Sequence, residues 1–502
     1  MAANVIQSTT SKVKSTAFTP VAMAIIAIGM VLQGVGKSPR TPYVSYYVDE
    51  NVEKRKTSMY LGIIITVCIF GPALAFGLGA VFSNIYVTLE DVAITTRDPR
   101  WIGAWWLGFL IFGIISIVIS LPLFCFPRNY QSNKKVIKTE PKKNIKFLSH
   151  IKGFVSTVLR LFRNGCFTFS ILGSCLQMFF VSGMISFMPK FLETQFTIPT
   201  WHDSGLNICS ASLGTFIGGF IVYKFRMTPY ACMKLALILT AITGFTLLLG
   251  FFVGCDNPEI IGYNTISNSN ITTCIEDCHC NKDTYFHVCG SDNRNYFSYC
   301  HEGGYADCKC IGEGATATPG LCKPDCDMLY DYISEVFVFA LLQTIALMPE
   351  YIFVMRCVED KDKAMALAFR SLLATVLGWF PGPVITGKVV DTCCRLWNTS
   401  CGGTGACALY DLVDFRYRRH ALDLGIKLVA TVFSFLAFMC ARNREDLKRK
   451  QVSKFEKTII PEGEELMEKS TADEHSYGNR KLSNGQPTLM FIMQYNIQFI
   501  HI

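Results

Sequence analysis

The stretch that decides the fold of this chain is Asp98-Pro99-Arg100-Trp101-Ile102-Gly103-Ala104-Trp105-Trp106-Leu107-Gly108-Phe109-Leu110. Three Trp residues, an Arg and an Asp lie together where a long apolar segment begins. Indole rings prefer the headgroup level of a bilayer, and small residues such as Gly103, Ala104 and Gly108 let helices approach closely. The stretch therefore predicts a membrane interface at the start of a transmembrane helix.

The composition of the whole chain points the same way. Of its 502 residues, 50% are hydrophobic and only 17% are charged, and the mean hydropathy is +0.31; soluble domains carry about 25% charged residues. The apolar residues gather in nine segments long enough to cross a bilayer. We expect spans at residues 17–35, 59–82, 103–126, 167–188, 204–223, 232–253, 332–355, 364–384 and 422–440. The predicted fold class is an all-α polytopic membrane protein. Residues 1–15 lack a cleavable signal peptide, so the first span would act as an internal signal.

The distribution of Lys and Arg predicts which loops are cytoplasmic. Residues 127–164 carry ten Lys and Arg against one acid, Glu140. Because cytoplasmic loops are enriched in Lys and Arg, this linker and the tail at 441–502 are expected inside. Every alternate loop agrees with that assignment. The net charge of +8 is therefore explained by topology near anionic lipid, and no nucleic-acid partner is expected.

Cysteines support the predicted sidedness. Two loops assigned to the outside hold even numbers of them, and disulfides persist in oxidising compartments. These disulfide candidates are Cys255, Cys274, Cys278, Cys280, Cys289, Cys300, Cys308, Cys310, Cys322 and Cys326 in one loop, and Cys393, Cys394, Cys401 and Cys407 in the other. Glycosylation acceptors lie in the same loops, at Asn270 and Asn398. The other eight cysteines are expected to be free thiols.

The opening stretch resembles the signature of the organic anion transporting polypeptide family, Asp-x-Arg-Trp-Ile/Val-Gly-Ala-Trp-Trp-x-Gly-Phe/Leu-Leu. The matching residues are Asp98, Arg100, Trp101, Gly103, Ala104, Trp105, Trp106 and Gly108. The resemblance implies a helix bundle of the major facilitator type. It also implies sodium-independent transport of amphipathic organic anions, such as bile acids, steroid conjugates, thyroid hormones or prostanoids, by alternating access at the plasma membrane. No cofactor is implied.

Residues 288–300 resemble a Kazal module, with its Cys-Gly-Ser/Thr-Asp-x-x-x-Tyr core. The family carries such a module between its ninth and tenth helices, whereas here it follows the sixth predicted span. A disulfide-stapled cap for a long loop is favoured over protease inhibition, because the stretch ahead of the core is short. Zinc binding at Cys278-His279-Cys280 and Cys308-Lys309-Cys310 is the other alternative. The C-x-C spacing matches zinc knuckles poorly, so no metal is predicted.

The resemblance also predicts that part of the family fold is absent. Six spans follow the basic linker but three precede it, so the chain corresponds to the family from its fourth helix onward. The expected domains are an incomplete N-terminal half at 1–126, the linker at 127–164, three spans at 165–254, the Kazal-like loop at 255–330, three spans at 331–440 with an outer loop at 385–417, and the tail at 441–502. The alternative function is a non-transporting, truncated or regulatory membrane protein. It would bind partners through the Kazal-like module or associate with a full-length relative.

Two ionisable residues inside predicted spans are candidates for the substrate path. Glu350 and Arg370 lie symmetrically about the turn near Asp360 and could pair across a helical hairpin. Charges in spans are costly and are often functional. Either the pair only holds two helices together, or Arg370 faces a cavity and attracts an anion while Glu350 tunes it.

Two departures from the family pattern bear on selectivity. The resemblance implies a basic residue six positions before a Pro-x-Pro step. Here that position is Thr375, ahead of Pro381-Gly382-Pro383. The family's Gly-x-Gly-Glu-Thr-Pro run reads 34–39 here, with Lys37 in place of the acid.

The segment after Thr375 is the best candidate for cavity lining. Trp379 and Phe380 could supply apolar walls for a bulky substrate, and the Pro-x-Pro break exposes backbone carbonyls. No nucleophile elbow, P-loop or metal-ligand helix is found in the sequence, so no enzyme activity is expected.

Overall fold

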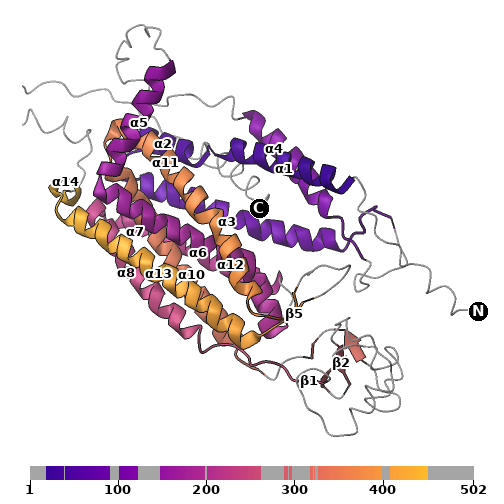
Figure 1. Cartoon of the computed structure of the whole chain (residues 1–502). Helices are drawn as coiled ribbons and strands as arrows, with labels where there is room; N and C mark the ends of the chain where they lie inside the picture. The colour runs from indigo at the N-terminus through magenta and orange to yellow at the C-terminus, as the bar shows by residue number, and fades with distance from the viewer. Residues whose placement is uncertain are drawn as a thin grey trace, which may run out of the picture.

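The computed structural model describes residues 18–38, 40–90, 101–122, 147–197, 201–261, 288–291, 293–296, 317–319, 321–322, 326–397 and 407–449. These residues are mostly helical (Figure 1). The helices are α1 (Phe18–Lys37), α2 (Arg40–Asn51), α3 (Thr57–Ser83), α4 (Trp105–Ser120), α5 (Phe147–Arg163), α6 (Gly165–Phe196), α7 (Trp201–Lys224), α8 (Pro229–Leu249), α10 (Leu329–Arg356), α11 (Lys363–Ala374), α12 (Pro381–Asp391), α13 (Leu412–Arg442) and α14 (Glu445–Lys448). A 3-10 turn, η4 (Asp360–Asp362), precedes α11, and a π-helical turn, η5 (Thr375–Trp379), joins α11 to α12.

Six apolar segments in the described part of the chain are long enough to cross a membrane. They are Thr57–Ser83, Gly165–Phe196, Pro229–Leu249, Leu329–Arg356, Asp360–Asp391 and Leu412–Arg442. Each coincides with a predicted span, which makes the chain a multi-pass helical membrane protein. The spans predicted at 17–35, 103–126 and 204–223 also fall on helices, α1, α4 and α7, but these are not among the six. Of these three, α4 has only 16 residues, fewer than a straight crossing of the bilayer requires.

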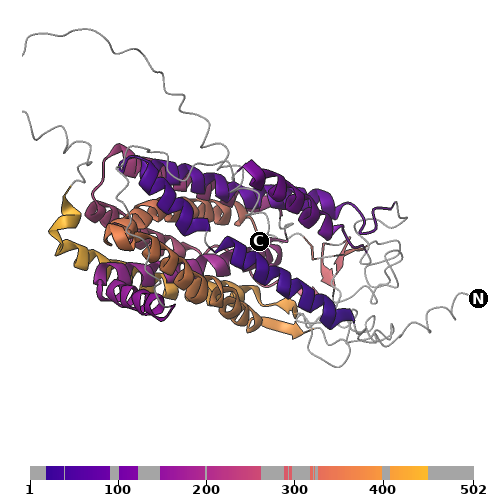
Figure 2. The same ribbon diagram turned by 90° about the horizontal axis from the view of Figure 1, so that it is seen from above.

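The two ends of the helix bundle differ in character. Strands β1 and β2 lie beyond one end, whereas α5 and α14 lie at the other (Figure 1). The view from above shows the same separation, with α14 in yellow far from the strands (Figure 2). The helices α5 and α14 therefore lie at the end of the bundle opposite the strands β1 and β2 (Figure 1, Figure 2).

Close helix packing joins the first helices to the rest of the bundle. α7 packs against α3 on one side and α10 on the other, and glycines face both neighbours. A Cβ added at Gly218 would lie 2.4 Å from the Ile345 carbonyl oxygen on α10. One added at Gly219 would lie 2.9 Å from the Ser58 oxygen on α3. Backbones this close gain dispersion and weak hydrogen bonds in a medium where burial of apolar area gives little.

The stretch 101–108 forms a clasp between α3 and α4. Trp101 donates its indole N–H to the Ser83 carbonyl at 2.8 Å, and Trp106 donates its own to Val87 at 3.0 Å. The backbone N–H of Ala104 lies 2.9 Å from the Ile85 carbonyl oxygen. These bonds satisfy the carbonyl of the last residue of α3 and two carbonyls of the turn that follows it, where helical partners run out. Asp98 and Arg100 lie outside the described residues, and α4 begins at Trp105, two residues after the predicted start.

The small module at the strand end is a four-stranded sheet in the order β1-β3-β2-β4. Its strands are β1 (Ile260–Ile261), β2 (Val288–Gly290), β3 (Asn295–Tyr296) and β4 (Ala317–Pro319). The β1–β3 pair is parallel and the other two pairs are antiparallel. Disulfides Cys255–Cys326 and Cys289–Cys322 staple the module. The Kazal resemblance stays a prediction.

A second cysteine-containing segment forms a hairpin of β5 (Cys394–Trp397) and β6 (Cys407–Tyr410), which the disulfide Cys394–Cys407 closes. The prediction that Cys393 is disulfide-bonded is wrong in this structure. Its thiol is free and buried, and it points back to the Val389 carbonyl of the preceding helix. The remaining candidates in the two loops, Cys274, Cys278, Cys280, Cys300, Cys308, Cys310 and Cys401, lie outside the described residues, as do Asn270 and Asn398.

Three elements differ from the sequence-based expectation. α13 begins at Leu412, ten residues before the predicted span, because Asp411 caps it by accepting from the Asp414 N–H at 3.0 Å. α2 was not predicted, since its 12 residues are too polar to register as a span. α5 lies inside the predicted linker at 127–164, where the basic residues obscured its apolar face.

We expect the substitution Gly103→Ala to destabilise the protein by about 1–3 kcal/mol, as overpacking of a tight site does. The added Cβ would lie 2.8 Å from the Ser83 Cα, and backbone cannot move aside as a side chain can. Thermal unfolding of the purified protein in detergent measures the effect. Gly108→Ala is the matched control, because its Cβ would meet the Phe82 ring at an ordinary 3.6 Å. Equal melting temperatures for the two variants would show that the clasp is not tightly packed.

Candidate functional site

A line of buried ionisable residues runs along one face of α13. Arg416, Arg419, His420, Asp423 and Lys427 are each less than a tenth exposed. Their spacing of three or four residues places them on the same side of the helix. α13 packs with this side against α6 and α8. The interior of this part of the bundle is therefore polar and charged along the first half of α13.

Lys427 is at the centre of a hydrogen-bonded network from four helices. Its ammonium group donates to Gln343 on α10 and to Gln177 on α6, the latter at 3.3 Å. The Gln343 amide also donates to Gln177. Thr240 and Thr243 on α8 complete the network with contacts of 3.4 Å to Gln177 and Gln343.

The Lys427 charge has aromatic neighbours but no acid in contact. Its Nζ lies 6.0 Å from the Phe180 ring centre and 5.7 Å from that of Phe339. Among the described residues, no carboxylate lies within ion-pair distance of this ammonium. Cation–π attraction and amide oxygens stabilise the charge locally without neutralising it. Glu350 is the described acid that interacts electrostatically with this ammonium, but it makes no direct contact with it.

Glu350 and Arg370 meet through a serine. Ser174 on α6 donates to the Glu350 carboxylate and accepts from Arg370 Nη2 at 3.4 Å. No direct ion pair joins the two charges in the part of the chain that the structure describes. The Arg370 guanidinium stacks 4.9 Å from the Tyr351 ring centre. The predicted juxtaposition of these residues across the α10–α11 hairpin is present, with α6 as a third wall.

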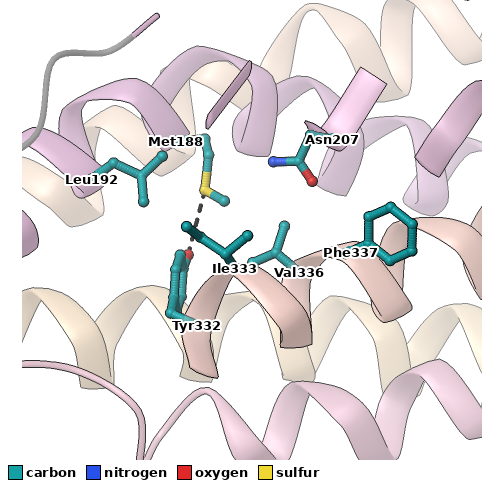
Figure 3. A pocket seen from close by; sticks show the side chains of 7 residues that line it. All are labelled: Met188, Leu192, Asn207, Tyr332, Ile333, Val336 and Phe337. Carbon is teal, nitrogen blue, oxygen red and sulfur yellow. Dashed lines mark hydrogen bonds between the residues drawn. The ribbon is translucent and has the colours of Figure 1, made fainter. Parts of the chain in front are cut away.

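An apolar cleft opens between α6, α7 and α10 near the strand end (Figure 3). Its lining residues are Met188, Leu192, Asn207, Tyr332, Ile333, Val336 and Phe337. The Tyr332 hydroxyl donates to the Met188 sulfur at 3.4 Å, the dashed contact in Figure 3. Asn207 is the polar side chain of α7 that faces this space. A small amphipathic group could therefore find apolar walls with one amide at the rim.

Arg419 lies directly behind this cleft. Its Nη2 lies 3.4 Å from the Met188 sulfur, and its guanidinium is 4.6 Å from the Phe191 ring centre. Asp423 approaches its Nε at 3.7 Å, which is a loose ion pair. Nη1 of Arg419 has no hydrogen-bond partner among the described residues. A buried guanidinium with an unused donor is thus separated from the cleft by a flexible methionine.

At the end opposite the strands, a carboxylate from α2 binds cations from the second half of the chain. Asp49 is 1% exposed and accepts from Arg356 at 2.5 and 3.2 Å and from Lys363 at 3.3 Å. Lys54 adds a contact at 2.8 Å. Nearby, the Tyr351 hydroxyl donates to Ser45 on α2 at 2.6 Å. We call Asp49, Lys54, Arg356 and Lys363 the clamp.

The charges of the clamp determine the ionisation of Asp49. Burial alone would raise the pKa of its carboxyl, but Arg356, Lys363 and Lys54 outweigh burial and lower the pKa to about 2. The carboxylate is thus fully ionised at neutral pH. The clamp joins α2 to α10 and α11 as a buried ionic lock.

The remaining predicted substrate-path residues lie mostly on the outside of the bundle. Thr375 is exposed and donates to the Ser371 carbonyl at 2.9 Å, and Phe380 is 74% exposed. Trp379 is half-buried, and Lys37 is the last residue of α1.

The Pro-x-Pro step follows a π-helical turn that packs against α6. The Phe380 N–H bonds to the Thr375 carbonyl at 3.0 Å, one residue further back than in an α-helix. Ser182 on α6 donates to the carbonyl of Gly378 at 3.3 Å. The loosened backbone is thus satisfied by protein, as it must be at membrane depth.

Sequence reasoning missed Lys427, Arg419, Asp423 and the clamp. The rule that singled out Glu350 and Arg370, an ionisable residue within a span, also applies to Lys427 and Asp423 at positions inside 422–440. Arg419 escaped notice because the span was predicted to begin after it. No sequence signal pairs Asp49 with Arg356, since 307 residues separate them.

We expect Lys427→Met to destabilise the protein by about 1–3 kcal/mol. The substitution keeps an apolar stem but removes the charged donor from the buried amide oxygens of Gln177 and Gln343, which keep only neutral donors. Detergent-solubilised protein melted under identical conditions would show the loss. Lys388→Met, at an exposed position in the last turn of α12, is the control and should change little. A Lys427→Met variant as stable as the control would contradict a structural role for the network.

We expect Asp49→Asn to cost about 3 kcal/mol, because it leaves buried cations with no carboxylate between them. A carboxyl whose pKa is lowered contributes stability above its unfolded pKa, and this is lost as pH falls through the folded pKa of about 2. The stability gap to wild type should therefore stay constant between about pH 5 and about pH 8.

Melting at several pH values checks this expectation for the clamp. Glu53→Gln is the control, since Glu53 is an exposed carboxylate paired with Lys56 that should contribute about 0–1 kcal/mol. A gap that changes with pH across the neutral range would show that Asp49 is not held ionised by the clamp.

Comparisons with known proteins identify the family to which this chain belongs. Residues 2–415 match the model of the Organic Anion Transporter Polypeptide (OATP) family. Human solute carrier organic anion transporter family member 4C1 is 28% identical over 475 residues, which are 86% of this chain and 66% of that protein. Human member 2B1 is 28% identical over 498 residues, covering 86% of this chain and 70% of that protein. Human member 1A2 is 28% identical over 439 residues, with coverage of 78% and 66%.

The chain spans about two thirds of the length of the curated relatives that it matches. The names of these relatives describe transporters. The family predicted from the stretch at 98–110 is confirmed: the chain belongs to the Organic Anion Transporter Polypeptide (OATP) family.

Proposed function

We propose that the protein carries amphipathic organic anions across the plasma membrane by alternating access, without coupling to sodium. The observation that carries this proposal is the buried ammonium of Lys427, which has no carboxylate within ion-pair distance among the described residues. Arg419 supports it, with an unused donor behind an apolar cleft. Excess positive charge in a low-dielectric interior attracts anions over long distances. The cleft offers walls for the apolar part of a substrate.

In this proposal Arg370 serves the anion path and Glu350 tunes it. Arg370 is only partly buried, and its Nε has no hydrogen-bond partner among the described residues. Glu350 is buried, and Ser174 lies between its carboxylate and Arg370. A shift of either charged side chain would therefore change the hydrogen bond that the other makes to the serine. Bile acids, steroid conjugates, thyroid hormones and prostanoids share the required chemistry, an apolar body with a carboxylate or sulfate.

The clamp would close the cytoplasmic end of the path. Alternating access requires one part of the bundle to rock against another around a central site. Asp49 on α2 binds Arg356 and Lys363 on the hairpin of α10 and α11, so this end cannot open until those ion pairs separate. The proposed arrangement has three spans before the linker and six after it, with the Kazal-like loop and outer hairpin outside the cell.

Uptake of a labelled steroid sulfate by cells that express the chain tests the proposal. We expect saturable uptake that falls at least about tenfold in Arg370→Ala, as loss of a charge contact in a binding step does. Surface biotinylation must show equal delivery of both proteins. Arg442→Ala is the matched control, because Arg442 is exposed in the last turn of α13 and should leave uptake unchanged.

The alternative function gives a different result in the same assay. A non-transporting membrane protein, acting through the Kazal-like module or through a full-length relative, would reach the surface and show no uptake alone. Uptake that appears only when a full-length relative is co-expressed would also favour this alternative.

A further inference from the structure

The helix α5 presents an apolar face that the protein does not cover. Phe154, Val155 and Leu159 are 48%, 47% and 57% exposed. On a helix of 3.6 residues per turn, these three positions share one side with Phe162. Polar residues, including Ser156, Thr157 and Arg163, occupy the other side. α5 is thus strongly amphipathic, with its apolar side open.

α5 is attached to the bundle at its last turn. Leu161 is buried, and Arg160 donates to both oxygens of Asp362 at 2.9 and 2.6 Å. The Phe162 ring meets Phe369 on α11 edge-on at 5.3 Å. The rest of the helix projects from the α11 side of the bundle (Figure 1). The contacts that fix α5 therefore leave Phe154, Val155 and Leu159 unpacked.

The positive charge of the linker that contains α5 favours anionic lipid as the surface that covers the apolar face of this helix. α5 lies at the end of the bundle away from the disulfide-bonded module (Figure 1), and the linker that contains it carries ten Lys and Arg against one acid. An apolar helix face beside dense positive charge is typical of segments that lie in the interface of an anionic bilayer. A protein partner would have to supply an acidic, apolar groove, whereas the inner leaflet next to the bundle already supplies both properties.

We propose that α5 docks through Phe154, Val155 and Leu159 onto anionic lipid of the cytoplasmic leaflet. The helix then lies in the interface, with its apolar side among the acyl chains and its basic neighbours at the headgroups. Docking also bears on the clamp, because Asp362, which Arg160 binds, immediately precedes Lys363, which binds Asp49. The inference concerns a lipid-binding surface and stands whether or not the chain transports anions.

Hydrogen exchange of the full chain in lipid nanodiscs tests this proposal. Amides of α5 should exchange at least about threefold more slowly in nanodiscs that contain phosphatidylserine than in pure phosphatidylcholine. The double variant Phe154→Ser/Leu159→Ser should lose this protection, and Arg163→Glu should lose its dependence on phosphatidylserine. Thr157→Ala, on the polar side of α5, is the matched control and should behave as wild type.

Exchange of α13 in the same samples reports whether a variant is folded. Unchanged α13 exchange together with lost α5 protection supports docking. Equal α5 exchange in both lipids, or in wild type and the double variant, would overturn the proposal. Protection that follows protein concentration and ignores lipid composition would also overturn it, because it would mean that a second copy covers the face.

Discussion

The constraint on which this structure depends is that a bilayer offers no water to buried polar groups. A charge that a helix carries into the bundle must find its partners within the protein. Gln177, Gln343 and the threonines of α8 do this for Lys427, and Ser174 does it for Glu350 and Arg370. The helices around α13 are thus held in place by specific donors and acceptors as well as by apolar contacts. The hydrogen bonds of these charged side chains therefore fix where the neighbouring helices lie, and the helices in turn fix where the charges lie.

The same constraint explains why α2 and α3 are attached to the second part of the chain in two different ways. Near the start of α3, glycines of α3 and α7 bring the two backbones into contact, which needs no charge at all. At the end of the bundle opposite the strands, the clamp uses a buried carboxylate and three cations. Thr57, the first residue of α3, also donates to Asp49 at 3.2 Å, so the glycine contact and the clamp hold the same end of these helices.

Much of the fold could be predicted from the sequence, because bilayer thickness imposes a length and a composition on each span. The signature at 98–110 identified the family. The structural reason for Gly103 is not visible in the sequence: a Cβ at this position would lie 2.8 Å from the Ser83 Cα. The site was only partly predictable. Glu350 and Arg370 stand out as charges in apolar segments, but Phe380 was expected to line a cavity and is exposed. Which side of a helix faces inward depends on its neighbours. Because apolar residues are favourable both against lipid and against protein, the sequence does not show which of the two an apolar side chain contacts.

The clamp was beyond sequence reasoning for a further reason. Asp49 and Arg356 come together through a series of helix contacts. α3, which follows α2, packs along α7, and α7 packs along α10. Each contact joins two neighbouring helices, but together they bring residues that are far apart in the sequence into contact. The pairing then gives one residue, Lys363, two acidic neighbours, Asp49 at 3.3 Å and Asp360 at 2.6 Å. Arg160 of α5 binds Asp362 in the same turn. A single short turn between α10 and α11 therefore receives contacts from α2 and α5, and movement of either helix changes the electrostatic environment of the other.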